Sequence, residues 1–299
     1  MTIPAPAITV LMPVFNAAKD LREAIDSILT QTERNFEFLI IDDGSTDSTA
    51  EILSSYTDPR IRRIQNPVNL GLVASLNIGI SLAKGAYLAR MDADDISLPD
   101  RLKHQLAFIE QEQADIVGCH FEIMDAQGKQ MQTVDAPLTA DAFTACLAST
   151  VPFAHGSVML RLAFLQKHGL SYGPNPFAED YDLWTRMYAC GAKMINIPLV
   201  LFRYRDYGSS LSKTKGAEYA FSSKNLRRQF VLQNVASCSS ALMRLVQADT
   251  LLSHTEQVNT INLAYRLYQQ NGHTRGLIPL FLRTSLKAKL HGIYRLLRA

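Results

Sequence analysis

Short apolar runs alternate with segments of helical periodicity four times between residues 7 and 112, and this alternation restricts the fold more than any other feature. Each apolar run has the length of a strand and ends at turn residues, and the segment after it spaces its apolar side chains as a helix does. Repeated strand–helix units predict a mainly parallel, doubly wound α/β sheet. The four expected strands are residues 7–14, 36–41, 61–64 and 86–91.

The pattern changes after a further expected strand at residues 115–124. Short helices are expected at 139–149 and 179–190, and a strand at 193–200 is interrupted by Pro198. Beyond these segments the periodicity is helical only. The second half of the chain therefore predicts fewer strands and more helices than the first.

Charge also divides the chain. Residues 1–206 hold 17 Lys/Arg against 25 Asp/Glu, a net charge of −8, whereas residues 207–299 hold 13 against 3, a net charge of +10. We therefore expect an α/β domain at 1–212 and a basic, mainly helical C-terminal extension at 213–299. Residues 276–299 are basic and amphipathic, which favours contact with an anionic membrane surface. The alternative is a helix packed on the body with its basic face in water.

Cysteine usage and the N-terminus indicate a cytoplasmic setting. The four cysteines are scattered rather than placed at metal-ligand or redox spacing, which is typical of reduced thiols. No charged region followed by an apolar stretch begins the chain, and no run of 18 apolar residues occurs in it. We expect a cytoplasmic protein with at most peripheral contact to the inner face of the membrane. No basic patch with interleaved aromatic residues appears, so no nucleic-acid partner is expected. The oligomeric state stays open.

Asp92-Ala93-Asp94-Asp95 directly follows the fourth expected strand, at the edge where open α/β sheets bind their ligands. Carboxylates this close repel one another unless a positive group neutralises them. Mg²⁺ and Mn²⁺ bind through one or two carboxylates and take phosphate oxygens and water as their other ligands. A solvated acidic turn is the alternative. The strand before the cluster favours a divalent-cation site, without deciding which carboxylate is the ligand.

Asp42-Asp43-Gly44-Ser45 stands at the end of the second expected strand, on the same edge of the sheet. Acidic residues in this position accept hydrogen bonds from a nucleoside, although an acidic turn also stabilises the helix that follows it. No G-x-G-x-x-G follows the first strand, where Pro13-Val14-Phe15-Asn16 stands instead. This difference argues against a dinucleotide cofactor.

Several segments together resemble one family, the GT-A-fold family 2 glycosyltransferases of bacterial polysaccharide and lipopolysaccharide assembly. The resemblance covers about residues 7–210, and its motifs occur in family order. It implies a GT-A (Rossmann-like) fold and inverting transfer of a hexose or N-acetylhexosamine from a nucleotide sugar to a glycan or lipid-linked saccharide, with uridine as the expected base. The segments that carry it are Thr9–Asn16, Ile40–Asp47, Asn69–Gly71 with Asn77 and Gly79, Ala89–Asp95 and Glu179–Trp184.

The resemblance implies a donor pocket with Mn²⁺ or Mg²⁺ at the strand ends. Asp94 is expected to contact the ribose or the metal, while Asp92 and Asp95 share the metal–diphosphate role, so all three are candidate metal ligands. The donor-binding residues that it implies are Pro13, Val14, Phe15, Asp42, Asp43, Asn69, Gly71, Asn77, Asp92, Ala93, Asp94 and Arg205.

On the acceptor side, the resemblance makes Asp180 the general base. A sugar hydroxyl is a poor nucleophile until its proton is removed, and an inverting displacement needs one carboxylate opposite the leaving group. Glu179 beside it would raise the pKa of Asp180 or bind acceptor hydroxyls; an ordinary acidic helix start is the alternative. His155, Trp184 and Asp182 are candidate acceptor contacts, although the helical spacing of Trp184 favours a place in the core.

Arg203 and Arg205 precede a Gly/Ser segment, residues 206–212, that is expected to close over the diphosphate, with either arginine as a phosphate clamp. The Gln-x-x-Arg-Trp motif of processive synthases is absent, which favours the addition of a single sugar. Two alternatives stay open: a non-catalytic nucleotide-sugar binding protein of this fold, and a sugar nucleotidyltransferase. The intact aspartates argue against the first, and the lack of a Gly-rich basic loop after the first strand argues against the second.

Overall fold

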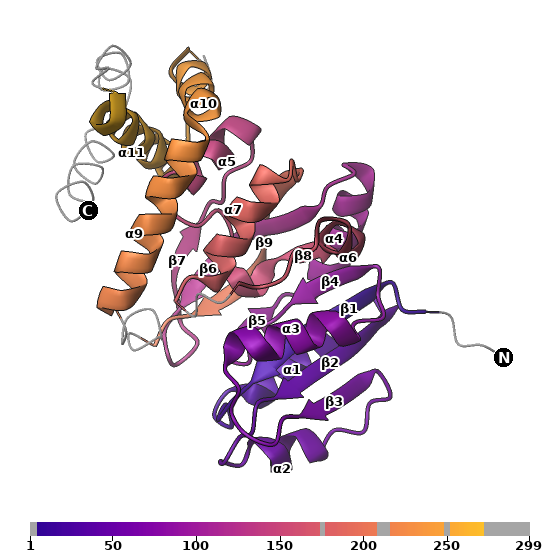
Figure 1. Ribbon diagram of the computed structural model, residues 1–299. Coiled ribbons are helices and arrows are strands. Elements are labelled where there is room, and N and C mark those ends of the chain that lie inside the picture. The colour runs from indigo at the N-terminus through magenta and orange to yellow at the C-terminus, as the bar shows by residue number, and fades with distance from the viewer. Residues whose placement is uncertain (1–4, 174–176, 208–215, 248–251, 272–299) are drawn as a thin grey trace. The chain divides into compact units, whose positions relative to one another are not determined.

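The computed structural model describes residues 5–173, 177–207, 216–247 and 252–271 (Figure 1). The chain forms two compact units, Met1–Val134 with Phe153–Thr214, and Asp135–Pro152 with Lys215–Ala299. Most of the expected closing segment at 206–212, and all of the amphipathic stretch at 276–299, lie outside the described residues.

The first unit is built on one nine-stranded sheet, and the expected α/β, Rossmann-like architecture is confirmed. Its strands are β1 (Ile8–Val14), β2 (Phe36–Asp42), β3 (Ile61–Gln65), β4 (Tyr87–Arg90), β5 (Ile96–Ser97), β6 (Ile116–Met124), β7 (Gln130–Val134), β8 (Met159–Arg161) and β9 (Met194–Arg205). They lie in the order β3-β2-β1-β4-β8-β6-β9-β5, with β7 beside β6.

The strand directions change along this sheet. The first four strands in the order are parallel to one another. The short strand β8 is antiparallel to both of its neighbours, β4 and β6. Beyond it, β9 is parallel to β6, while β5 and β7 are antiparallel edge strands. The parallel half thus follows directly from the strand–helix repeats, whereas the other half is mixed.

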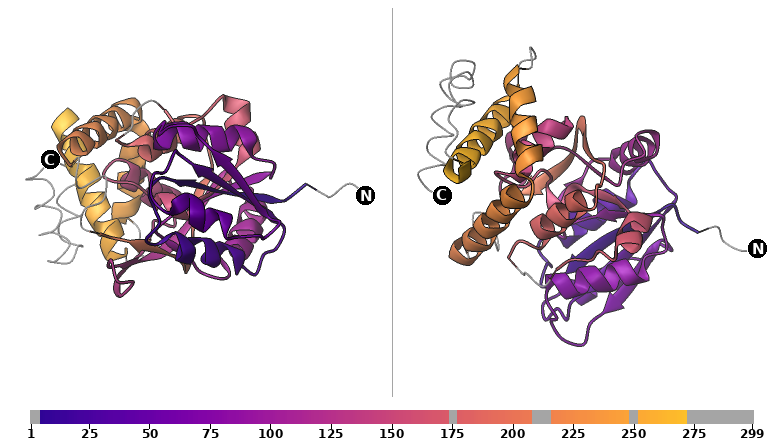
Figure 2. Two further views of the ribbon diagram at one scale, coloured as in Figure 1. Left: turned by 90° about the horizontal axis from the view of Figure 1, so that it is seen from below. Right: turned by 45° about the horizontal axis from the view of Figure 1, so that its top comes forward.

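Helices cover both faces of the parallel half, as Figures 1 and 2 show for α1 and α3. Alternate residues of β1, including Val10 and Met12, pack in one core with α1. Leu11 points to the other face, where a Cβ added to Gly79 of α3 would come within 2.2 Å of it. Gly79 therefore permits α3 to pack directly on β1. The helices of this unit are α1 (Leu21–Leu29), α2 (Thr49–Ser54), α3 (Leu72–Leu82), α4 (Arg101–Gln111), η1 (His155–Ser157), α6 (Leu162–His168) and α7 (Glu179–Ala189).

One strand boundary differs from the expectation. The strand expected to be interrupted at Pro198 continues through it to Arg205, because the pairing of β9 with β6 shifts register between Cys119 and His120. Such a bulge leaves residues without a ladder partner, so a proline without an N–H is accommodated. The short strands β5 and β7 and helix α6 were not expected, since each is brief or weakly patterned.

The second unit consists of helices. Helix α5 (Ala140–Leu147) packs against α10 (Val235–Gln247) and α11 (His254–Asn271), and α9 (Gly216–Gln233) precedes them. Ser149 donates to Asn259 at 2.7 Å, and Arg244 pairs with Asp141 at 2.6 Å. The expected helix at 139–149 thus joins the helices of the C-terminal part. None of the helices in the described part of the chain is long and apolar enough to cross a membrane.

Candidate active site

Asp43, which follows β2, binds the loop after β3 through both oxygens of its carboxylate. Its Oδ1 accepts hydrogen bonds from Asn66 Nδ2 at 2.7 Å and from the backbone N–H of Leu70 at 3.0 Å. Its Oδ2 accepts from the backbone N–H of Gly71 at 2.8 Å. Gly44, at φ +73°, lies so close to this loop that an added Cβ would reach Val68 at 2.7 Å. The structure therefore brings the expected donor residues Asp43, Asn69 and Gly71 together.

Phe15 is the exposed member of this strand-end group. Pro13 and Val14 are buried, whereas 46% of the Phe15 side chain is exposed. The next residue, Asn16, has a positive φ of 50° and accepts a hydrogen bond from the backbone N–H of Thr46 at 2.8 Å. This contact fixes the turn after β1 against the turn after β2. An aromatic side chain left exposed here can pack against a nucleoside base.

The aspartate loop after β4 is shaped by two arginines. Buried Arg90 pairs with the Asp92 carboxylate. The backbone N–H of Arg205 donates to Asp95 Oδ1 at 2.7 Å. Asp95 Oδ2 is buried and has no hydrogen-bond partner among the described residues. A Cβ added to Gly156 would meet Asp92 Oδ2 at 2.8 Å and Asp95 Oδ2 at 3.1 Å, so these two oxygens face the same small space.

The electrostatics of this loop fit a bound cation. Burial, and then the charge of Asp92, raises the pKa of Asp94 to about 6 and that of Asp95 well above its ordinary value. An unpartnered buried carboxylate oxygen with a raised pKa is stabilised when a positive ion neutralises it. In the described part of the chain no three His, Cys, Asp or Glu side chains already converge as a complete ligand set. One or two carboxylates suffice, however, when a diphosphate supplies the other ligands.

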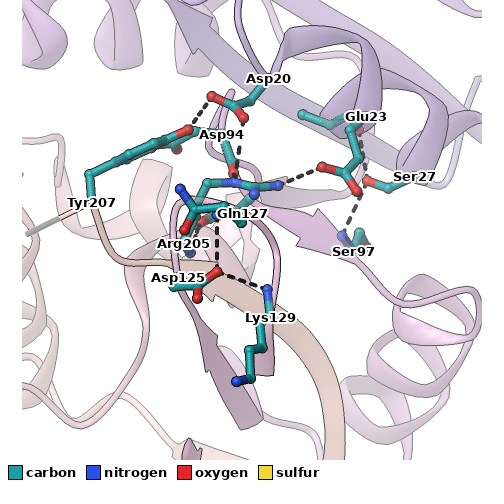
Figure 3. Close-up of polar contacts among 12 residues, drawn as sticks. Asp20, Glu23, Ser27, Asp94, Ser97, Asp125, Gln127, Lys129, Arg205 and Tyr207 are labelled. Atoms are coloured by element: carbon teal, nitrogen blue, oxygen red, sulfur yellow. Dashed lines mark hydrogen bonds and ion pairs between the residues drawn. The ribbon is translucent and has the colours of Figure 1, made fainter. Parts of the chain in front are cut away.

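Arg205 is occupied by contacts within the protein (Figure 3). Its Nε donates to the carbonyl oxygen of Asp94 at 2.8 Å, and its Nη2 donates to Glu23 at 2.5 Å. The Asp20 carboxylate lies 3.7 Å from the same Nε and also accepts a hydrogen bond from the Tyr207 hydroxyl. The guanidinium therefore links α1 to the aspartate loop, and its expected contact with the donor stays a prediction. Arg203 pairs instead with Glu122 at 2.8 Å.

Glu179 and Asp180 begin helix α7. Asp180 Oδ1 accepts from the backbone N–H of Tyr181 at 2.7 Å. Burial, and then the neighbouring Asp180 charge, raises the pKa of Glu179 to about 7. Burial also raises the pKa of Asp180. Carboxyl groups whose pKa values approach neutrality are suited to accept a proton at neutral pH.

The three expected acceptor contacts differ in their surroundings. His155 lies with its Nδ1 3.8 Å from Glu179. Asp182 is held by Arg186 at 2.7 Å. Trp184 is completely buried, with its ring against Phe153 and His155. The expected contact of Trp184 with the acceptor is therefore wrong for this structure, because no face of the ring is exposed. Trp184 lies in the core, as its helical spacing favoured.

Asn77, in the middle of α3, binds the backbone of Tyr172. Asn77 Nδ2 donates to the Tyr172 carbonyl at 3.0 Å, and the Tyr172 N–H donates to Asn77 Oδ1 at 3.0 Å. Sequence reasoning missed both Tyr172 and Arg90. Arg90 had a signal, namely a charged residue inside an apolar strand two positions before Asp92, where strand alternation places both side chains on one side.

Comparisons with known proteins agree with this fold. The family model described as Glycosyl transferase family 2 matches residues 9–169. An uncharacterized glycosyltransferase of Haemophilus influenzae is 29% identical over 279 residues, which cover 88% of this chain and 86% of the relative. Among solved structures, residues 1–349 of S. aureus TarS in complex with UDP superpose with a TM-score of 0.60 at 19% identity, covering 96% of this chain and 78% of that one. Mannosyltransferase PcManGT from Pyrobaculum calidifontis, in complex with GDP-Man and Mn²⁺, gives 0.57 at 17% identity, covering 98% and 86%.

Proposed function

Since this chain belongs to glycosyl transferase family 2, we propose that it transfers one hexose or N-acetylhexosamine, with inversion, from a nucleotide-diphosphate sugar to a hydroxyl of a saccharide acceptor. The observation that carries this proposal is the pair formed by Arg90 and Asp92. Apart from burial, the charges of this pair act on the pKa values of two carboxylate clusters, Asp94–Asp95 and Glu179–Asp180. In this proposal the two clusters belong to one site: Asp94–Asp95 bind the cation, and Glu179–Asp180 accept the proton of the attacking hydroxyl.

The donor side uses the strand ends. Phe15 and the loop held by Asp43 take the nucleoside, and the aspartate loop takes the diphosphate. Asp92, Asp94 and Asp95 would hold Mn²⁺ or Mg²⁺, which neutralises the charge that builds on the leaving diphosphate. UDP is the donor nucleotide that we propose. TarS in complex with UDP supports it, while PcManGT in complex with GDP-Man marks guanosine as the competing base.

On the acceptor side, Asp180 removes the proton from the attacking hydroxyl as the new bond forms. Its place in a buried first turn of α7 keeps its pKa raised, which increases its basicity. The acceptor that we propose is a glycan or a lipid-linked saccharide. Contact with an anionic membrane surface through residues 276–299, on the cytoplasmic side, belongs to the same proposal and rests on their basic, amphipathic sequence.

A panel of nucleotide sugars tests this function. Purified full-length protein is incubated with Mn²⁺ and each UDP- or GDP-sugar, with and without simple saccharide acceptors, and released nucleotide is measured. We expect one sugar to be turned over, no turnover after treatment with EDTA, and a product whose anomeric configuration by NMR is opposite to that of the donor. Turnover at the full rate in EDTA contradicts the metal assignment, and retention of configuration contradicts the single displacement.

A further inference from the structure

A partly buried chain of polar contacts leads from α3 to the first residue of α7. Asn77 and the Tyr172 backbone exchange two hydrogen bonds of 3.0 Å. The Tyr172 hydroxyl lies 2.8 Å from His155 Nε2, and His155 Nδ1 lies 3.8 Å from Glu179 Oε1. The His155 imidazole therefore lies between the Tyr172 hydroxyl and the Glu179 carboxyl group, and Asn77 holds the backbone of Tyr172.

The positions of the protons follow from burial and charge. Burial raises the pKa of Tyr172, so its hydroxyl keeps its proton. Burial, and then the charge of Arg90, lowers the pKa of His155 well below its ordinary value, so the ring is neutral and carries one N–H. If that hydrogen were on Nε2, the lone pair of Nδ1 would face the Glu179 carboxylate. Donation by the phenol to Nε2 avoids this opposition and places the hydrogen on Nδ1, toward Glu179.

We propose that Tyr172 and His155 are positioning residues for the carboxylate pair of α7: the Tyr172 hydroxyl fixes the imidazole as its Nδ1–H tautomer, and that N–H orients Glu179 beside Asp180. At 3.8 Å the contact with Glu179 is too long for a hydrogen bond. Contacts of this kind commonly tighten when substrate binds. The part of the inference that concerns the transfer step rests on the proposed function, whereas the tautomer does not.

The tautomer is tested without any ligand. Full-length protein labelled with ¹⁵N-histidine gives a long-range ¹H–¹⁵N spectrum in which the two neutral tautomers differ, and the His155 signal is identified by its loss in His155→Asn. At about pH 8, where Glu179 with its pKa of about 7 is mostly ionised, we expect the Nδ1–H pattern, and we expect Tyr172→Phe to change it. The matched control is Tyr56→Phe, which removes a hydroxyl bonded to Asp26 at 2.9 Å and leaves the His155 signal unchanged. An Nε2–H or charged ring in the unaltered protein overturns the inference.

Kinetics test the positioning role, using the donor and acceptor selected by the nucleotide-sugar panel. Removing the Tyr172 hydroxyl leaves the donor residues in place, so kcat should fall about tenfold while the donor KM changes less than about twofold. His155→Asn places an amide N–H near the position of Nδ1, whereas His155→Gln places its amide near Nε2. We expect Asn to retain more kcat than Gln or Ala.

The two proposals fail in different ways. Equal kcat for Tyr172→Phe and the unaltered protein, or better rescue by Gln than by Asn, overturns the positioning role. If no nucleotide sugar is turned over by the unaltered protein, the proposed function fails, and the spectrum still decides the tautomer. Thermal unfolding of each variant shows whether a fall in kcat is accompanied by loss of the fold.

Discussion

The backbone N–H of Arg205 donates to Asp95 Oδ1 at 2.7 Å, which joins the last residue of β9 to the aspartate loop after β4. The Arg205 side chain, 4% exposed, adds contacts with Asp94, Glu23 and Asp20. The buried guanidinium therefore links Asp94 to α1, while the backbone N–H of the same residue links Asp95 to β9.

Removal of the Arg205 side chain should therefore destabilise the protein. Arg205→Ala leaves the Asp94 carbonyl oxygen and the partly buried Asp20 carboxylate without this donor, whereas Glu23 is 56% exposed and can be hydrated. We expect a loss of about 2 kcal/mol in the free energy of unfolding. Denaturant unfolding followed by circular dichroism measures it. The matched control is Arg203→Ala, because the Arg203 side chain is 41% exposed and pairs with Glu122 at 2.8 Å. A surface pair of this kind contributes below about 1 kcal/mol. Equal losses in the two variants would contradict the anchoring role of Arg205.

The parallel half of the sheet could be predicted from the sequence because its signals are local. Strands β1 and β2 of that half are short apolar runs that are buried on both faces. The side chains at the strand ends, such as Asp43 and Asp94, were found for the same reason, since the end of an apolar run is visible in the sequence.

Contacts between distant segments could not be predicted in this way. Asn77 and Tyr172 are 95 positions apart, and Arg205 and Asp95 are 110 apart, so neither partner carries a local sign of the other. Arg205 was interpreted as a phosphate clamp because a sequence shows its charge but not the carboxylates that surround it. The sequence predicts a strand at 193–200 that is interrupted by Pro198, because the bulge that accommodates this proline depends on the partner strand β6.

The Asp43→Asn substitution should loosen the loop that carries the expected donor residues. An amide nitrogen in place of one carboxylate oxygen opposes the N–H groups of Leu70 or Gly71, so at least one donor loses its acceptor. We expect a cost of about 1–3 kcal/mol in the free energy of unfolding. Amide hydrogen exchange at Leu70 and Gly71 should accelerate.

Asp58→Asn is the control for Asp43→Asn. The Asp58 carboxylate pairs with Arg60 at 2.8 Å, and Asp58 precedes β3, whereas the loop of Leu70 follows that strand. Exchange at Leu70 and Gly71 should stay as in the unaltered protein. If Asp43→Asn also leaves these two amides unchanged, Asp43 does not hold the loop.

Stability without metal should depend on pH through the aspartate loop. The pKa of Asp94 is raised by burial and by Asp92 from 3.8 to about 6 in the folded protein. A raised folded pKa favours the neutral acid, so this stabilising contribution is complete below about 4 and is lost as the pH rises through about 6. In EDTA, the melting temperature should therefore lose this contribution between about pH 4 and about pH 6, less steeply in Asp94→Asn.

Mn²⁺ should reverse the destabilisation by the ionised loop at pH above about 7, because a ligand that binds the folded state raises its stability. Thermal scans with Mn²⁺ and with EDTA at each pH measure the difference between the two curves. A buffer without divalent cations, brought to the same ionic strength with Na⁺, controls for the screening of the loop's charges by salt. Identical curves with Mn²⁺ and EDTA at neutral pH would contradict a cation site in this loop.

Asp180→Asn should separate donor binding from transfer. Asparagine keeps the size of the side chain but has no basic oxygen for the hydroxyl proton, so kcat should fall at least about 100-fold while nucleotide binding by calorimetry stays within about twofold. In the unaltered enzyme, kcat/KM should decline on the acid side of the profile at a higher pH than an ordinary aspartate would give, since burial raises the pKa of Asp180. Protonation of the base removes the free enzyme's activity on this side of the profile. Asp141→Asn, which removes a charge engaged with Arg244 at 2.6 Å, is the control and should retain most of kcat. Transfer by Asp180→Asn at the rate of the unaltered enzyme would assign the base to another group, and the nearest carboxylate to test next is Glu179.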